Sequence, residues 1–97
     1  MATFVVLAGF TDRGISKVKE TVGRAEAFKE MAKMSGVTVK NIYWTLGRHD
    51  LVAICEVPDD DAATAFSLSV ASRGFMRFET LRAFSFDEMK SVLDKMV

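Results

Sequence analysis

Apolar and polar positions along the chain predict an alternation of strands and helices. Four short apolar runs are rich in β-branched and aromatic residues and are bounded by turn residues, which is typical of buried strands. These runs are residues 4–10, 37–46, 51–57 and 75–84. Apolar residues recur at helical spacing between the first and second runs, and again between the third and fourth. The predicted order is therefore strand, helix, strand, strand, helix, strand.

Polar residues and glycines predict where the helices begin and end. The turn Thr11–Gly14 is expected to cap a short helical piece that begins near Ile15, and Thr21 is expected to cap the longer helix. Gly36 suits the end of that helix. Three aspartates at 59–61 open the next helix, where their charges match the positive end of the helix dipole.

A further helix is expected after the fourth strand. Ser85 is followed three residues later by Glu88, which forms a capping box. The expected apolar face of this helix consists of Met89, Val92, Leu93 and Met96. The β-α-β-β-α-β order plus this C-terminal helix predicts an α+β, ferredoxin-like fold with a four-stranded antiparallel sheet. All 97 residues fit one domain, 1–97.

Two of the predicted strands are apolar on both faces. In strand 4–10, Val5 and Leu7 point away from Phe4 and Val6, and strand 51–57 shows the same property. An antiparallel sheet with helices on one side normally shows polar residues on its other side. We therefore expect a second copy of the chain to cover this face, in a homodimer or larger homo-oligomer of the dimeric α/β barrel type. The alternative is that the terminal helix folds over it.

Composition and charge argue against several classes of partner. The 13 Lys and Arg residues balance 13 Asp and Glu residues, and no basic run marks a track for nucleic acid. No apolar run reaches the ~20 residues that span a bilayer, and the N-terminus lacks signal-peptide features. The single cysteine, Cys55, is expected to be a small buried residue in a reducing compartment. We expect a cytoplasmic protein without nucleic-acid or membrane partners.

His49 and Asp50 are the candidate catalytic residues, because histidine is the side chain that titrates near neutral pH. Two interpretations stay open. In one, the pair belongs to a polar turn in which Asp50 bonds to local backbone amides. In the other, His49 shuttles a proton or ligates haem or a metal. No catalytic motif is present, and no metal site is expected because the chain has only one Cys and one His. The sequence leaves the cofactor unknown.

Four other residues are candidate ligand-binding residues. Tyr43 and Trp44 are adjacent in a strand, so one of them must lie on the open face, at an interface or a ligand pocket. Thr80 and Arg82 share one face of strand 75–84, and a buried arginine requires a partner. An anionic ligand and an intersubunit salt bridge would both meet that requirement.

The chain resembles the GYD domain family, whose small proteins are placed with the dimeric α/β barrel, ferredoxin-like group. The matching stretches are Thr11-Asp12-Arg13-Gly14-Ile15, Arg24-Ala25-Glu26-Ala27-Phe28, Tyr43-Trp44-Thr45-Leu46-Gly47 and Glu79-Thr80-Leu81-Arg82-Ala83-Phe84. The naming motif reads Gly47-Arg48-His49-Asp50 here, with His49 where tyrosine is usual. The resemblance implies the fold and self-association more than an activity.

Three functions are compatible with these observations. The first is a small-molecule-binding or regulatory homo-oligomer with a cavity between its sheet and helices. The second is a haem-dependent or cofactor-independent monooxygenase that uses His49 with Trp44 or Tyr43. The third is a purely structural interaction module. The first is favoured because no set of residues supplies both a nucleophile and a base, although the sequence does not decide whether the protein is an enzyme.

Overall fold

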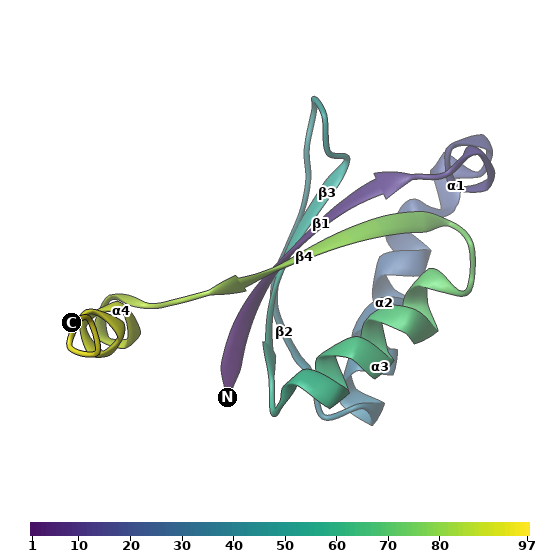
Figure 1. The fold of residues 1–97 in the computed structure, drawn as a ribbon. Coiled ribbons are helices and arrows are strands. Elements are labelled where there is room, and N and C mark those ends of the chain that lie inside the picture. Colours follow the sequence, from purple (N-terminus) through teal and green to yellow (C-terminus); the bar gives the residue numbers. More distant parts are fainter.

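A computed structural model describes all residues, 1–97, and places four strands in one antiparallel sheet (Figure 1). The strands are β1 (Ala2–Phe10), β2 (Thr38–Trp44), β3 (Leu51–Val57) and β4 (Met76–Ala83). Their order across the sheet is β2-β3-β1-β4. The predicted α+β, ferredoxin-like fold is confirmed, and each predicted strand is correct to within two residues at each end.

Two helices cover one face of the sheet, and the C-terminal helix lies apart from them (Figure 1). The covering helices are α2 (Thr21–Met34) and α3 (Asp60–Ala71). Two short pieces, α1 (Asp12–Ser16) and the 3-10 helix η1 (Val18–Glu20), connect β1 to α2. The C-terminal helix α4 (Phe86–Leu93) follows β4 and does not join the helical layer. No helix in the structure combines the length and the apolar character that crossing a membrane requires.

The core lies between the sheet and the two covering helices. Alternate residues of β1 and β3 point into it, as the period of a strand requires. Phe28 of α2 and Phe66 of α3 meet there, with ring centroids 5.0 Å apart. Cys55 is 2% exposed, and burial raises the pKa of its thiol to about 11. The prediction that Cys55 is a small buried residue is therefore confirmed.

Two predicted helix starts are wrong. Helix α1 begins at Asp12 and not near Ile15, because the Thr11 side chain accepts a hydrogen bond from the Gly14 backbone N–H at 3.0 Å. Thr21 does not cap α2, since its own backbone is already helical and the N-cap is Glu20. The Thr21 hydroxyl instead accepts a hydrogen bond from the Trp44 indole N–H at 3.1 Å. The capping box of Ser85 and Glu88 is present as predicted.

The turn after β1 is attached to the start of β4. The Thr11 backbone N–H donates to the Phe75 carbonyl at 3.2 Å, and the Thr11 hydroxyl donates to the Gly74 carbonyl at 2.6 Å. Gly14 packs so closely here that an added Cβ would overlap the Phe75 carbonyl oxygen. The glycine at position 14 is therefore required by the approach of two backbones.

We predict that Gly14→Ala lowers the free energy of unfolding by roughly 1–3 kcal/mol, because the new methyl group forces these backbones apart. The matched control is Gly23→Ala in α2, where nothing lies within 4 Å of the added Cβ. The control should raise the free energy of unfolding by about 0.5–1 kcal/mol, since alanine favours a helix. Urea unfolding followed by circular dichroism measures both, and a Gly14→Ala protein as stable as the parent would refute the close approach.

Candidate functional site

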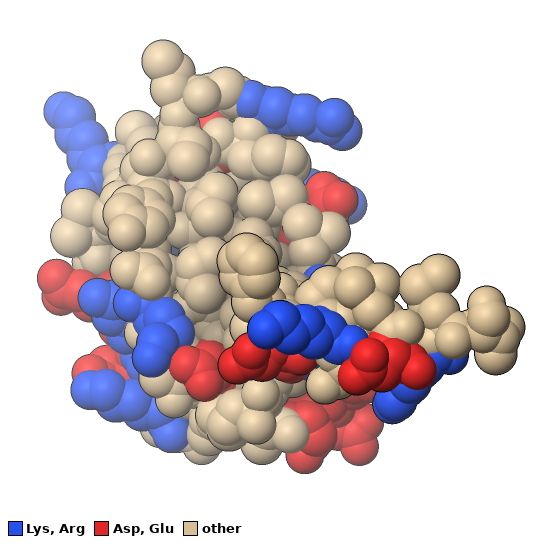
Figure 2. Space-filling view, turned by 90° about the vertical axis from the view of Figure 1, so that its left-hand side faces the viewer, with Lys and Arg blue, Asp and Glu red and all other residues tan.

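The face of the sheet that α2 and α3 leave uncovered is apolar at its centre. Strand register places Val5 between Ile54 and Leu81, and Leu7 between Val52 and Glu79. We call this surface the open face; it consists of Val5, Leu7, Tyr43, Val52, Ile54 and Leu81. None of these residues is fully buried. Figure 2 views the molecule from the side on which α4 projects and shows a broad area with few charged side chains. The predicted two-sided apolar sheet is thus confirmed.

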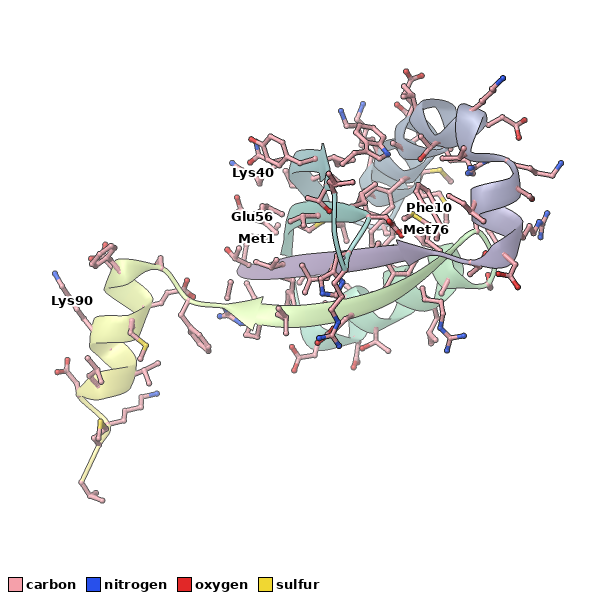
Figure 3. All side chains as sticks on the ribbon, turned by 90° about the horizontal axis from the view of Figure 1, so that it is seen from above. Met1, Phe10, Lys40, Glu56, Met76 and Lys90 are labelled. Atoms are coloured by element: carbon pink, nitrogen blue, oxygen red, sulfur yellow. The ribbon has the colours of Figure 1, made fainter.

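The open face is not covered by the C-terminal helix, so that alternative is wrong. Helix α4 buries none of its residues and adds none to the core. Figures 1 and 3 show it projecting from the end of β4, with Lys90 far from the body of the molecule. The radius of gyration is 14.6 Å, against about 12.5 Å for a compact chain of this length. The projecting helix accounts for this elongation.

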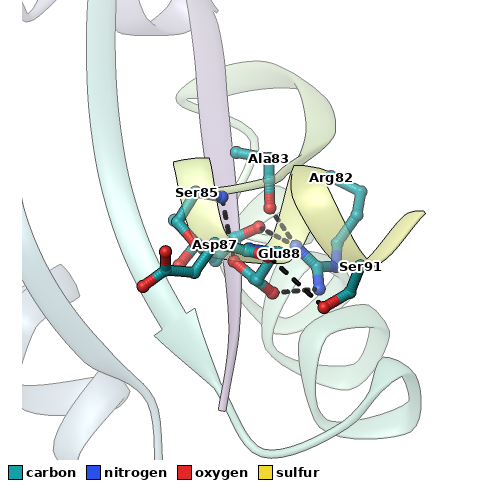
Figure 4. A network of polar contacts seen from close by, with 7 residues as sticks. Arg82, Ala83, Ser85, Asp87, Glu88 and Ser91 are labelled. Carbon is teal, nitrogen blue, oxygen red and sulfur yellow. Dashed lines mark hydrogen bonds and ion pairs between the residues drawn. The ribbon is translucent and has the colours of Figure 1, made fainter. Parts of the chain in front are cut away.

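Polar contacts around Arg82 hold the first turn of α4 in place (Figure 4). The Arg82 guanidinium donates to the Glu88 carboxylate at 3.0 Å and to the carbonyl of Ala83, and it lies 4.4 Å from the centroid of the Phe84 ring. Glu88 also accepts from the Ser85 backbone N–H at 3.0 Å, while the Ser85 hydroxyl accepts from the Glu88 N–H at 3.1 Å. Arg82 therefore has an ion-pair partner in its own chain, which the residue pattern did not indicate.

These contacts explain the acidity of Glu88. The hydrogen bond from the Ser85 backbone N–H, followed by that from Arg82, holds the pKa of the Glu88 carboxyl below its usual 4.5. The carboxylate is thus the favoured form in the folded chain. Both interactions of Glu88 depend on this charge.

The turn between β2 and β3 is tied to the end of β1 through Asp50. The Asp50 carboxylate accepts from the Phe10 backbone N–H at 2.9 Å, and the Asp50 N–H donates to the Ala8 carbonyl at 2.8 Å. His49 is half-buried and its imidazole makes no hydrogen bond, while the His49 carbonyl accepts from the Thr45 hydroxyl at 2.6 Å. No group of three or more His, Cys, Asp or Glu side chains that could hold a metal ion occurs in the structure.

The four candidate ligand-binding residues fall into two separate pairs. Tyr43 lies on the open face, whereas Trp44 faces α2 and bonds to Thr21. Thr80 and Arg82 line a groove between β4 and α3, together with Phe4 and Leu68. Strands β2 and β4 are the two opposite edges of the sheet. The structure therefore brings together Thr80 and Arg82, but it separates Tyr43 from Trp44 and places both at the opposite edge of the sheet.

A cavity of about 120 Å³ lies between the sheet, α2 and α3. Its lining is mainly apolar and includes Phe28, Met31, Ile42 and Phe78, and none of the six candidate site residues belongs to it. At one end stands Phe75, with the guanidinium groups of Arg13 and Arg24 at 4.3 and 4.5 Å from its ring centroid. Arg13 and Arg24 belong to the stretches 11–15 and 24–28, which therefore meet at Phe75. These two stretches are the one sequence signal that could have indicated this end of the cavity.

Comparisons with known proteins agree on the family. The model of the GYD domain family matches residues 4–93. A protein of Thermus thermophilus named "Glutamine synthetase and cystathionine beta-lyase binding protein" is 34% identical over 84 residues, which cover 86% of this chain and 88% of that protein. The crystal structure of TTHA0845, also from Thermus thermophilus, is similar with a TM-score of 0.57 at 26% identity, covering 88% of this chain and 95% of that one.

We predict that the carboxyl of Glu88 titrates below pH 4.5 in the folded chain. Its support of the first turn of α4 is present above the unfolded-state pKa and is lost as the pH falls through the lower folded-state pKa. Carboxyl-carbon NMR titration measures the midpoint. Arg82→Gln should move the midpoint part of the way back towards 4.5, whereas Arg77→Gln, on the other face of β4, should leave it unchanged. Equal midpoints in all three proteins would contradict this assignment.

Proposed function

The chain belongs to the GYD domain family, and we propose that it is a non-enzymatic regulatory protein that associates with itself and binds a metabolic enzyme. The observation that carries this proposal is the uncovered apolar surface on the side of the sheet opposite α2 and α3. Single exposed apolar residues are normal on a protein surface, but a contiguous patch of this kind marks an interaction site. The family and the surface thus support a binding role.

Self-association is the simplest way to cover the open face. Apolar surface gains about 25 cal/mol for each Å² removed from water, and a second copy offers the same surface in return. The zero formal net charge of the chain means that two copies approach without overall repulsion. A homo-oligomer would therefore remove the open face from water without a second kind of protein.

An enzyme partner is supported by the relative whose name describes binding to two enzymes. Glutamine synthetase and cystathionine β-lyase are accordingly the first partners to test for this chain. The non-enzymatic part of the proposal is supported by Asp50, whose carboxylate accepts a hydrogen bond from the Phe10 backbone N–H. Asp50, one of the two candidate catalytic residues, therefore has a structural role.

We predict that Leu81→Lys on the open face raises the Kd for self-association at least tenfold, which corresponds to about 1.4 kcal/mol. Leu81 is 43% exposed, so the substitution does not disturb the core of one copy. The matched control, Leu68→Lys, changes a leucine of α3 that is 65% exposed and lies away from the open face, and it should leave the Kd unchanged. Sedimentation velocity over a concentration series measures the three constants, and a parent protein that stays monomeric would refute self-association.

The enzyme-binding part is tested with the same three proteins. Each is titrated onto purified glutamine synthetase and cystathionine β-lyase from the host of this chain, and both binding and enzyme activity are recorded. Saturable binding of the parent protein with a change in enzyme activity is expected. Absence of binding to both enzymes would refute this part of the proposal and leave self-association to stand or fall on its own measurement.

The cavity favours a second function, the binding of a small apolar molecule. A dry apolar cavity of about 150 Å³ in another protein binds benzene, so the cavity near Phe28 is of a suitable size and character. A ligand held between the sheet and both covering helices would stabilise their packing. In a regulatory protein, such a ligand would report the level of a metabolite.

We predict that benzene, used as a probe, shifts the NMR signals of side chains that line the cavity, such as Met31 and Ile42. Ala25→Leu places three further carbon atoms in the cavity lining and should abolish the shifts. The matched control, Ala71→Leu at the exposed end of α3, should retain them. Identical benzene-induced shifts in both variants would show that the probe binds elsewhere.

A further inference from the structure

We infer that α4 is an exchanged arm: in a pair of chains, the apolar side of each α4 packs on the open face of the other copy. This inference rests on the proposed self-association and adds the segment that mediates it. It assigns one occupant, a second copy of this chain, to two surfaces that are both unpartnered within one copy.

The composition of α4 calls for a packing partner. Its apolar side chains remain 41–90% exposed over Phe86, Met89, Val92 and Leu93, and Met96 beyond its end is 73% exposed. An isolated helix shorter than about 12 residues is marginal in water, because its few hydrogen bonds do not offset the cost of nucleation. The capping box supports the first turn only. A stable α4 of eight residues therefore needs contacts along its apolar side.

The junction with β4 directs α4 away from the open face of its own chain (Figure 1). Only Phe84 and Ser85 separate the strand from the helix, and two extended residues span about 7 Å. Folding back over the sheet would require a reversal of the chain within this distance. It would also break the contact of Arg82 with Glu88, which joins β4 to the first turn of α4.

The position of α4 fits a second copy. Helix α4 projects on the side of the sheet away from α2 and α3, which is also the side of the open face (Figure 1). A partner that lies against the open face is therefore within reach of the arm. Leu81 of the open face belongs to the same strand that leads into α4.

Symmetry and area both favour this occupant. Each copy carries one arm and one open face, so a two-fold arrangement covers both arms and both faces at once. A stable interface buries ~800 Å² on each partner. The open face alone consists of six residues, and the exposed apolar residues of the arm, including Phe86 at 90%, extend it towards the area that a stable dimer needs.

The decisive experiment detects contacts between chains. Full-length protein with labelled methionine methyl groups is mixed with full-length protein carrying labelled isoleucine and valine methyl groups, in a deuterated background. We expect intermolecular NOEs from Met89 and Met96 to Val52 and Ile54. Contacts from α4 methyl groups to a different surface of the partner, or to none, would overturn the inference.

A pair of variants gives an independent measurement. Leu93→Lys places a charge on the apolar side of α4 and should raise the dimer Kd at least tenfold. Ser91→Lys adds the same side chain to the same helix outside the apolar side and should leave the Kd unchanged. Circular dichroism of dilute samples checks that each variant keeps the parent fold.

The outcomes separate the arm from the proposed self-association. A Leu93→Lys protein that dimerises as tightly as the parent, while Leu81→Lys does not, would overturn the exchanged arm and retain the open-face interface. A parent protein without a dimer at any concentration would overturn both. Loss of dimerisation in Leu93→Lys but not in Ser91→Lys would support the arm.

Discussion

The central physical constraint on this molecule is a sheet with two apolar faces and helices for only one of them. Helices α2 and α3 bury the side chains of Val6, Ala8 and their neighbours, and the remaining side of β1 and β3 is left to water. Because apolar burial is the main favourable term in folding, a single copy leaves part of this favourable burial unused. The proposed binding role follows from the same deficit that limits the stability of one copy.

Local interactions at the end of β4 direct α4 away from the uncovered apolar face of the sheet. Arg82 of β4 forms an ion pair with Glu88, and the capping box fixes the first turn of α4. The connection between β4 and α4 is only two residues long. A looser connection would let the helix collapse onto its own sheet and satisfy it within one chain. The polar network in Figure 4 joins the first turn of α4 to β4, and α4 lies apart from the sheet of its own chain.

The two binding features occupy opposite sides of the sheet. The cavity beside Phe28 lies under the covering helices, while the open face lies beyond the other surface of the same strands. Val6 lines the cavity, and its neighbours Val5 and Leu7 belong to the open face. If the proposed functions hold, this separation would allow a small ligand and a protein partner to bind at the same time, with one layer of strands between them.

The sequence alone determined the features that depend on residues close together in the chain. Period-two and helical patterns predicted the strands and helices, and the Ser85 and Glu88 capping box was readable because its members are three residues apart. Contacts between distant residues could only be decided by the tertiary structure. They include the bond from Trp44 to Thr21, the bond of Asp50 to the Phe10 backbone, and the guanidinium groups around Phe75. Such contacts depend on how strands and helices pack, which no local pattern encodes.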